Sequence, residues 1–290
     1  MSLSFHPCWV CNSKTLVLFK KNNLNKTLTS SSFAITDSSY GETTTLGKCT
    51  SCNFIQSVDD VNVIEYYNDL EDNGYEDSRK ERSLQSKKIL AVIKKIKQEG
   101  ELLDVGAGSG ILVEQALLEN YHAIGVEPSI WLQKKAAERN LPVIQGVIPH
   151  EEITRKFNII TLVDVIEHIN NPYTLLVDLK QNLYQDGILV IITPDAGSFT
   201  AKILGGKWWH FRIAHIGYFN KNNLNKLLTR AGYTKVSVQY ATWYFSVEYL
   251  FERLKKYLPF LSLLPLPPPF KKITIPLNLR DSIFAIYKLE

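Results

Sequence analysis

The chain has 290 residues, of which 45% are hydrophobic and 21% are charged. This is the composition of an ordinary globular protein, and the length allows one large domain and a smaller one. The formal net charge of +4 is too small to argue for a nucleic-acid partner. No apolar run is long enough for a membrane span and no secretory signal is recognisable, so we expect a cytoplasmic protein.

The four cysteines form two CxxC pairs, Cys8 with Cys11 and Cys49 with Cys52. Two such pairs are typical of a zinc site with four thiolate ligands, and a site closed by four protein ligands is structural. Disulfides are disfavoured without a secretion signal, and a redox role explains only one pair. We therefore predict a small zinc-ribbon-like module over residues 1–56, with a hairpin made by "KTLVLFKKN" and "TSSSFAIT".

Residues 57–80 are acidic and rich in tyrosine, and we interpret them as a linker. In the second domain, residues 81–290, apolar strands alternate with helices. The expected strands are 101–105, 122–127, 141–146, 157–164, 187–194, 234–241 and 281–289, and the expected helices are 83–98, 111–120, 129–140, 172–183 and 220–233. This alternation predicts an α/β fold with a mostly parallel sheet covered on both faces.

An apolar insertion, residues 243–280, precedes the last expected strand. Five prolines in "YLPFLSLLPLPPPF" exclude a continuous helix over residues 257–270. We interpret this stretch first as an apolar loop packed on its own domain. The alternatives are a peripheral contact with a membrane surface, a dimer surface or a cover for a substrate. The sequence does not rank these three roles, and it indicates no oligomeric state.

The stretch "ELLDVGAGSG" places three glycines at alternate positions directly after an apolar strand. Dinucleotide-binding loops read GxGxxG instead, and a carboxylate at Asp104, two residues before the first glycine, would repel a pyrophosphate. A P-loop is excluded because no GK[ST] follows. The turn therefore favours a ligand with a cationic group or hydroxyls.

Polar or small residues also follow the next three expected strands. Glu127 ends the second strand, Gln145 and Gly146 end the third, and Asp164 ends the fourth. Ligands of open α/β sheets bind at the carboxyl ends of the strands. The sequence therefore predicts a ligand site at this edge of the sheet.

The motifs "LLDVGAGSG", "GVEPS" and "VDVIEHINNP" together resemble those of the class I S-adenosylmethionine (SAM)-dependent methyltransferases, over about residues 85–240. The resemblance implies a Rossmann-like, seven-stranded sheet and SAM as the cofactor. By position, Gly106, Ala107 and Gly108 would lie against the methionine moiety. Asp104 would hold its amino group, and Glu127 would accept hydrogen bonds from both ribose hydroxyls.

The same resemblance assigns the remaining cofactor residues. Pro128, in the motif "GVEPS", would belong to the cofactor site, Gln145 and Gly146 would lie near the adenine, and Asp164 and Val165 would line the methionine side. Every position of the motif set holds a suitable residue type. This argues against a non-catalytic zinc-ribbon adaptor with a degenerate SAM site.

Transfer of a methyl group to oxygen or carbon also needs a base on the acceptor side. The aromatic segment 193–220, with a flexible Gly205–Gly206 joint, is the expected acceptor lid. Within it "RIAHIGYF" resembles the "YHEHxxYF"-like stretch of zinc-containing, sugar-modifying methyltransferases, and it retains His215 but not the first histidine or the glutamate. We therefore predict His215 as the catalytic base.

We predict O-methylation of a small molecule, a sugar or glycan-pathway metabolite that is free or lipid-linked. The alternative is an RNA-modifying methyltransferase that uses the zinc module for binding. The mild charge and the acidic residues 57–80 disfavour that alternative, so we expect no nucleic-acid partner.

Overall fold

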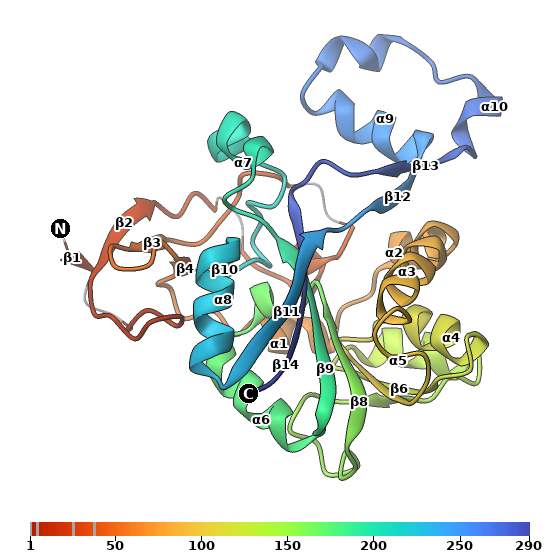
Figure 1. Cartoon of the computed structure of the whole chain (residues 1–290). Coiled ribbons are helices and arrows are strands. Elements are labelled where there is room, and N and C mark those ends of the chain that lie inside the picture. The colour runs from red at the N-terminus through yellow and green to blue at the C-terminus, as the bar shows by residue number, and fades with distance from the viewer. Residues whose placement is uncertain (1, 4–5, 25–26, 37–38) are drawn as a thin grey trace.

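The computed structural model describes residues 2–3, 6–24, 27–36 and 39–290 (Figure 1). Within these residues the strands form a seven-stranded, a five-stranded and a two-stranded sheet. The strands of the largest sheet are β5 (Glu101–Val105), β6 (His122–Glu127), β7 (Val143–Gln145), β8 (Phe157–Val163), β9 (Leu183–Pro194), β11 (Tyr233–Tyr240) and β14 (Ser282–Leu289).

The order of the seven strands is β11-β14-β9-β8-β5-β6-β7. Strands β5 to β9 are mutually parallel, whereas β14 runs antiparallel to both β9 and β11. The order reverses between β5 and β8, so the carboxyl ends of these two strands flank the switch point of the sheet. The predicted α/β, Rossmann-like seven-stranded fold is confirmed.

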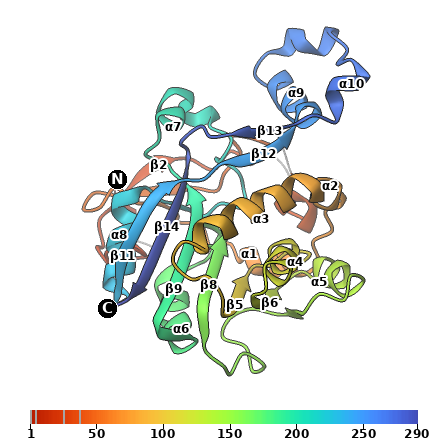
Figure 2. The same ribbon diagram turned by 45° about the vertical axis from the view of Figure 1, so that its right-hand side comes forward.

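Helices cover both faces of this sheet (Figures 1 and 2). The helices are α3 (Arg79–Ile93), α4 (Ile111–Leu118), α5 (Ile130–Ala137), α6 (Pro172–Gln181) and α8 (Lys221–Arg230). Successive residues of one strand point to opposite faces of the sheet. Ile159 packs in the core that contains α3 and α4, and Ile160 packs in the core that contains α6 and α8. Burial on both faces explains why these strands read as continuous apolar runs.

The N-terminal module forms the five-stranded sheet. Its strands are β1 (Ser2–Leu3), β2 (Leu16–Lys20), β3 (Leu46–Cys49), β4 (Ile55–Ser57) and β10 (Gly217–Tyr218). The short β10 comes from the second domain and pairs antiparallel with β4. The cores of the two parts also merge, because Phe54 packs against Phe219 with ring centroids 4.7 Å apart.

The predicted hairpin is wrong in its second strand. The segment "TSSSFAIT" forms a short 3-10 helix, η1 (Ser30–Phe33), and β2 pairs instead with β3. Thr29 and Ser32 form a reciprocal capping box, and such local side-chain bonds compete with strand pairing. The register that places Leu16 opposite Cys49 brings the two CxxC pairs together.

Residues 57–80, interpreted above as a linker, contain two short helices, α1 (Val63–Asn68) and α2 (Asn73–Asp77). Asp72 is buried there and accepts hydrogen bonds from Tyr75 N–H at 3.0 Å and from the Thr36 backbone N–H at 2.8 Å. These bonds tie the segment to the N-terminal module.

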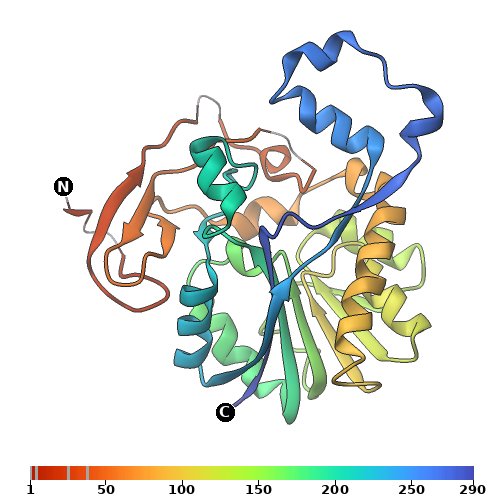
Figure 3. The ribbon, with the colours of Figure 1, turned by 45° about the horizontal axis from the view of Figure 1, so that its top comes forward.

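The insertion lobe, residues 243–280, projects away from the rest of the chain (Figure 3). It contains β12 (Trp243–Ser246), α9 (Val247–Lys255), η4 (Pro259–Leu263), α10 (Pro268–Lys271) and β13 (Thr274–Leu277). None of its residues is buried, and Leu263 is 84% exposed. Among the described residues, no helix combines the length and apolar character needed to cross a bilayer.

Phe54 provides a test of the joint between the two parts. Phe54→Ala should lower the free energy of unfolding by about 3–5 kcal/mol, because a fully buried ring is lost and a cavity remains. Chemical denaturation measures this change. The matched control is Phe199→Ala, whose ring is 75% exposed and whose loss should change stability by about 0.5 kcal/mol or less. Equal effects would mean that the two parts do not share a core.

Candidate cofactor and acceptor site

The glycine turn after β5 requires glycine for two reasons. Gly106 and Gly108 have φ angles of +74° and +55°, which side chains rarely adopt. A Cβ atom at Gly106 would also lie 2.5 Å from Val165 Cγ2, and one at Gly108 would clash with the Tyr75 hydroxyl. Ala107, between them, is 4% exposed. The turn thus brings bare backbone to the carboxyl edge of the sheet.

Glu127, at the end of β6, is held by the backbone on two sides. One carboxylate oxygen accepts from Gly108 N–H at 2.8 Å and the other from Ser129 N–H at 2.8 Å. Burial raises the pKa of Glu127 to about 7, and the two backbone donors oppose that shift. Pro128 follows directly, and Ser129 then caps α5. The carboxylate is therefore fixed beside the glycine turn.

Asp104 lies next to the end of β5 and is also buried. Its Oδ1 accepts from the Thr161 hydroxyl at 2.6 Å, across the β5–β8 pair. Burial raises the pKa of Asp104 to about 7, and the bond from Thr161 lowers it. A cationic ligand group at this edge would stabilise the charged carboxylate.

The ends of β7 and β8 complete this edge. Gln145 Nε2 donates to the Pro128 carbonyl at 3.1 Å, and Gly146 N–H donates to the Glu127 carbonyl at 2.9 Å. Asp164 and Val165 follow β8; burial raises the pKa of Asp164 to about 7, while Arg82 and Arg212 oppose the shift. The structure brings the predicted cofactor residues to one edge. Their contacts with a cofactor stay a prediction.

The segment interpreted above as a linker covers this edge, and its individual contacts are seen only in the structure. Tyr75, in α2, lies against Gly108, and the Arg82 guanidinium sits 4.0 Å from the centre of the Tyr75 ring. Arg79 donates to Ser109 Oγ at 3.0 Å and to Glu114 at 2.7 Å. The tyrosine-rich composition of residues 57–80 is the signal that pointed to buried aromatic contacts.

His215, the predicted base, lies beside a 3-10 helix, η2 (Ile166–His168), that follows β8. The His215 and His168 rings meet edge to face, with centroids 4.8 Å apart. His215 is 6% exposed, and burial lowers its pKa well below the usual value, with further lowering by His168 and Arg212. The imidazole is therefore neutral near pH 7 and offers a lone pair.

The expected aromatic lid is largely core. Trp208 and Phe219 are 0% exposed, and Trp209 Nε1 donates to Asp281 at 3.1 Å. The exposed apolar residues of this segment lie instead in α7 (Phe199–Leu204), which precedes η3 (Gly205–Lys207). Arg212 donates to the carbonyls of Ala34 and Ile35, so it joins the acceptor segment to the N-terminal module.

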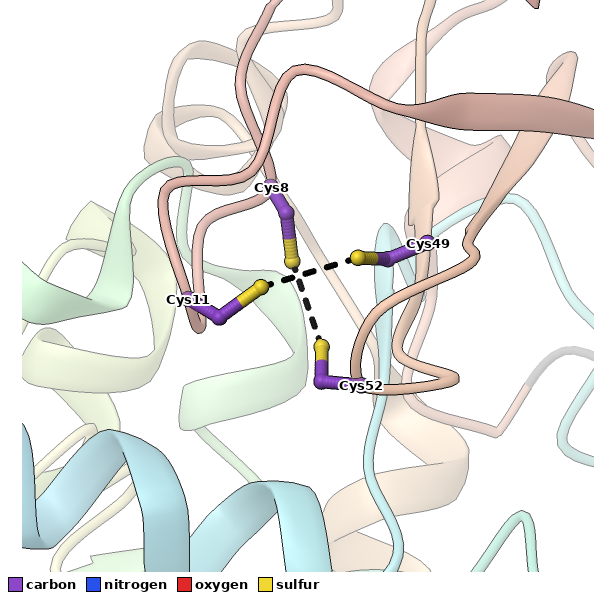
Figure 4. Close-up of side chains that lie close together, drawn as sticks. All are labelled: Cys8, Cys11, Cys49 and Cys52. Atoms are coloured by element: carbon purple, nitrogen blue, oxygen red, sulfur yellow. Dashed lines mark hydrogen bonds between the residues drawn. The ribbon is translucent and has the colours of Figure 1, made fainter.

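The four cysteines of the N-terminal module converge on one point (Figure 4). The sulfur atoms of Cys8 and Cys52 lie 3.5 Å apart, and those of Cys11 and Cys49 lie 3.6 Å apart. A disulfide needs about 2.05 Å, whereas a tetrahedron with Zn–S bonds of about 2.3 Å has edges of about 3.8 Å. The four thiols are free and fit a closed, structural zinc site.

The sequence profile of a family described as "Methyltransferase domain" matches residues 77–238, which is more than half of the chain. The protein belongs to the SAM-dependent methyltransferase family. A SAM-dependent methyltransferase of known structure from Archaeoglobus fulgidus superposes with a TM-score of 0.50 at 17% identity, over 75% of this chain and all of that protein. This likeness supports the class I methyltransferase fold.

Two relatives are ubiquinone biosynthesis O-methyltransferases. The protein from Glaesserella parasuis is 30% identical over 122 residues, which cover 37% of this chain and 52% of the relative. The protein from Maricaulis maris is 28% identical over 117 residues, which cover 37% of this chain and 46% of the relative. The methyltransferase thus spans about half the length of the curated relatives that it matches.

The zinc site gives one prediction. Cys49→Ser should lower the zinc content of the methyltransferase by one ion and destabilise the N-terminal module, because the ion then loses a thiolate ligand. Elemental mass spectrometry and thermal unfolding measure the two effects. Ser51→Ala, an exposed change in the same turn, should alter neither. Full zinc content in Cys49→Ser would contradict the four-cysteine site.

Glu127 gives a second prediction. Glu127→Ala should weaken SAM binding on the order of 100-fold, because the two charge-assisted hydrogen bonds expected to the ribose would be lost. Calorimetric titration with SAM measures this change. The control is Glu138→Ala at the C-cap of α5, whose side chain is 60% exposed and whose loss should leave the affinity unchanged. Equal affinities in the two variants would remove Glu127 from the cofactor site.

Proposed function

We propose that this methyltransferase transfers the methyl group of SAM to a hydroxyl oxygen of a small molecule. The observation that carries the proposal is the buried imidazole of His215, which has an unpaired Nδ1 and contacts His168 of η2. Val165, the residue before η2, lies against the glycine turn at Gly106. The names of the relatives, which are O-methyltransferases of ubiquinone biosynthesis, support oxygen as the acceptor atom.

The proposed step balances without a further reactant. SAM supplies an electrophilic methyl group on its sulfonium sulfur. The S–CH3 bond breaks as the O–CH3 bond forms, S-adenosylhomocysteine leaves, and the hydroxyl proton must be taken up on the acceptor side. Nδ1 of His215 has no hydrogen-bond partner among the described residues, so its lone pair is free to assist deprotonation of the hydroxyl.

For the acceptor we propose a sugar or glycan-pathway metabolite. The support is the resemblance of "RIAHIGYF" to the stretch found in zinc-containing, sugar-modifying methyltransferases. In this chain β10 lies within that stretch and completes the sheet of the cysteine module. The N-terminal module therefore packs against the segment that carries His215. This contact favours a structural role for zinc, in supporting that segment, over a role in binding nucleic acid.

The test is His215→Ala. Turnover should fall about 10²–10⁴-fold, the usual contribution of a positioned acid–base group, while SAM affinity stays unchanged. Release of S-adenosylhomocysteine is measured with panels of nucleotide sugars and catechols, using His122→Ala, with a 78% exposed side chain, as the control.

Carbon-13-labelled SAM identifies the product, because O–CH3, N–CH3 and C–CH3 groups have distinct chemical shifts. Unchanged turnover in His215→Ala would remove His215 from the reaction. A methyl group found on nitrogen or carbon would overturn O-methylation.

A further inference from the structure

Three residues from two distant segments meet beside the expected acceptor position. Glu167 and His168 belong to η2, and His215 lies just before β10. Each offers one ligand atom, and the three atoms all lie within 4.8 Å of one another. The backbone fixes this meeting, because Ile216 N–H donates to the Glu167 carbonyl at 2.9 Å.

Two of these groups have unused lone pairs in a buried place. Glu167 Oε2 accepts from the Thr193 hydroxyl at 2.9 Å, but Oε1 has no hydrogen-bond partner within the described chain. His215 Nδ1 likewise has none there. Glu167 is 1% and His215 is 6% exposed. Buried polar atoms are nearly always paired, so two unpaired lone pairs in one cluster suit a bound group that accepts electron pairs.

His168 has the arrangement of a metal-binding histidine. Its Nδ1 lies 2.7 Å from the Ala214 carbonyl oxygen, which can only accept, so Nδ1 carries the proton and Nε2 keeps a lone pair. Metal-bound histidines usually donate their other ring N–H to a carbonyl or carboxylate, and metal-bound carboxylates are themselves hydrogen-bonded. Ala214 and Thr193 supply these two outer contacts for His168 and Glu167.

We propose that Glu167, His168 and His215 bind a divalent first-row transition-metal ion, such as Zn²⁺, Mn²⁺ or Fe²⁺. Two imidazoles and one carboxylate suit ions of this class. Unlike the four-cysteine site, three protein ligands leave a coordination position open. The proposal rests on the proposed O-methylation and deepens it: His215 would promote deprotonation of the hydroxyl through the ion.

In this arrangement the acceptor is a small molecule that presents a hydroxyl oxygen to the open position. The ion lowers the pKa of that hydroxyl, whose proton passes to water, and the oxygen then takes the methyl group from sulfur. The ion therefore both orients the acceptor and stabilises its negative charge. A molecule with two neighbouring hydroxyls, such as a sugar or a catechol, would bind best.

The first experiment needs no variant and no acceptor. The purified protein is titrated with Co²⁺ and followed by absorption spectroscopy, which separates thiolate charge-transfer bands from the weaker bands of nitrogen and oxygen ligands. We expect two classes of bound ion, one with thiolate bands and one without. A thiolate site alone at saturating Co²⁺ would overturn the proposal.

The second experiment uses matched variants. Glu167→Gln and His168→Ala should remove the ion without thiolate bands and keep the thiolate-bound ion, which also reports that the module is folded. Thr193→Val keeps the shape of the side chain and should weaken Co²⁺ binding about 10- to 100-fold, the usual effect of losing an outer contact. His122→Ala should bind both ions like the wild type. Wild-type metal binding in both Glu167→Gln and His168→Ala would overturn the site.

The tests of the metal site and of the proposed O-methylation can fail independently of each other. Metal binding is measured without acceptor, whereas O-methylation is measured by product analysis. If His215→Ala abolishes turnover and the Co²⁺ titration shows the thiolate site alone, direct base catalysis stands and the metal site fails. If two ions bind and the methyl group appears on nitrogen or carbon, the metal site stands and O-methylation fails.

Discussion

The main physical constraint on this structure is the burial of several carboxylates at the carboxyl edge of its largest sheet. Asp104, Glu127 and Glu167 are each 1–4% exposed, and burial raises the pKa of each. Taking anions out of water is costly unless hydrogen bonds or cations compensate. Backbone N–H groups and threonine hydroxyls supply part of that compensation. A ligand with a sulfonium and an ammonium group would supply more, which is an electrostatic reason to expect SAM at this edge.

The acceptor side is built by contacts between segments that are distant in the chain. Ile216 bridges them: its N–H donates to the Glu167 carbonyl and its carbonyl accepts from Ser57 N–H at 2.7 Å. Arg230 adds a second tie through the carbonyls of Trp9 and Val10, both at 3.0 Å. The cysteine module therefore packs against the wall that carries His215. A zinc ion there would stiffen this wall from a distance.

Much of the sheet could be predicted because its signals are local. The apolar strands and the glycine turn followed from residue type and spacing. The second strand of the N-terminal hairpin could not be predicted in this way, since its serines bond within their own turn. The helices in residues 57–80 also escaped prediction, because Tyr75 and Asp72 gain their burial from distant partners.

The sequence by itself determined the fold class and the residue types at the carboxyl edge, because strand periodicity and turn geometry are short-range properties. The family followed from the resemblance of three motifs. It also marked the four cysteines as one set, because CxxC spacing alone presents two thiols together. Only the tertiary structure decided that His215 lies close to Glu167 and His168, and that Arg212 donates hydrogen bonds to the N-terminal module. Such meetings depend on how separate segments pack together, and no spacing within either segment encodes them.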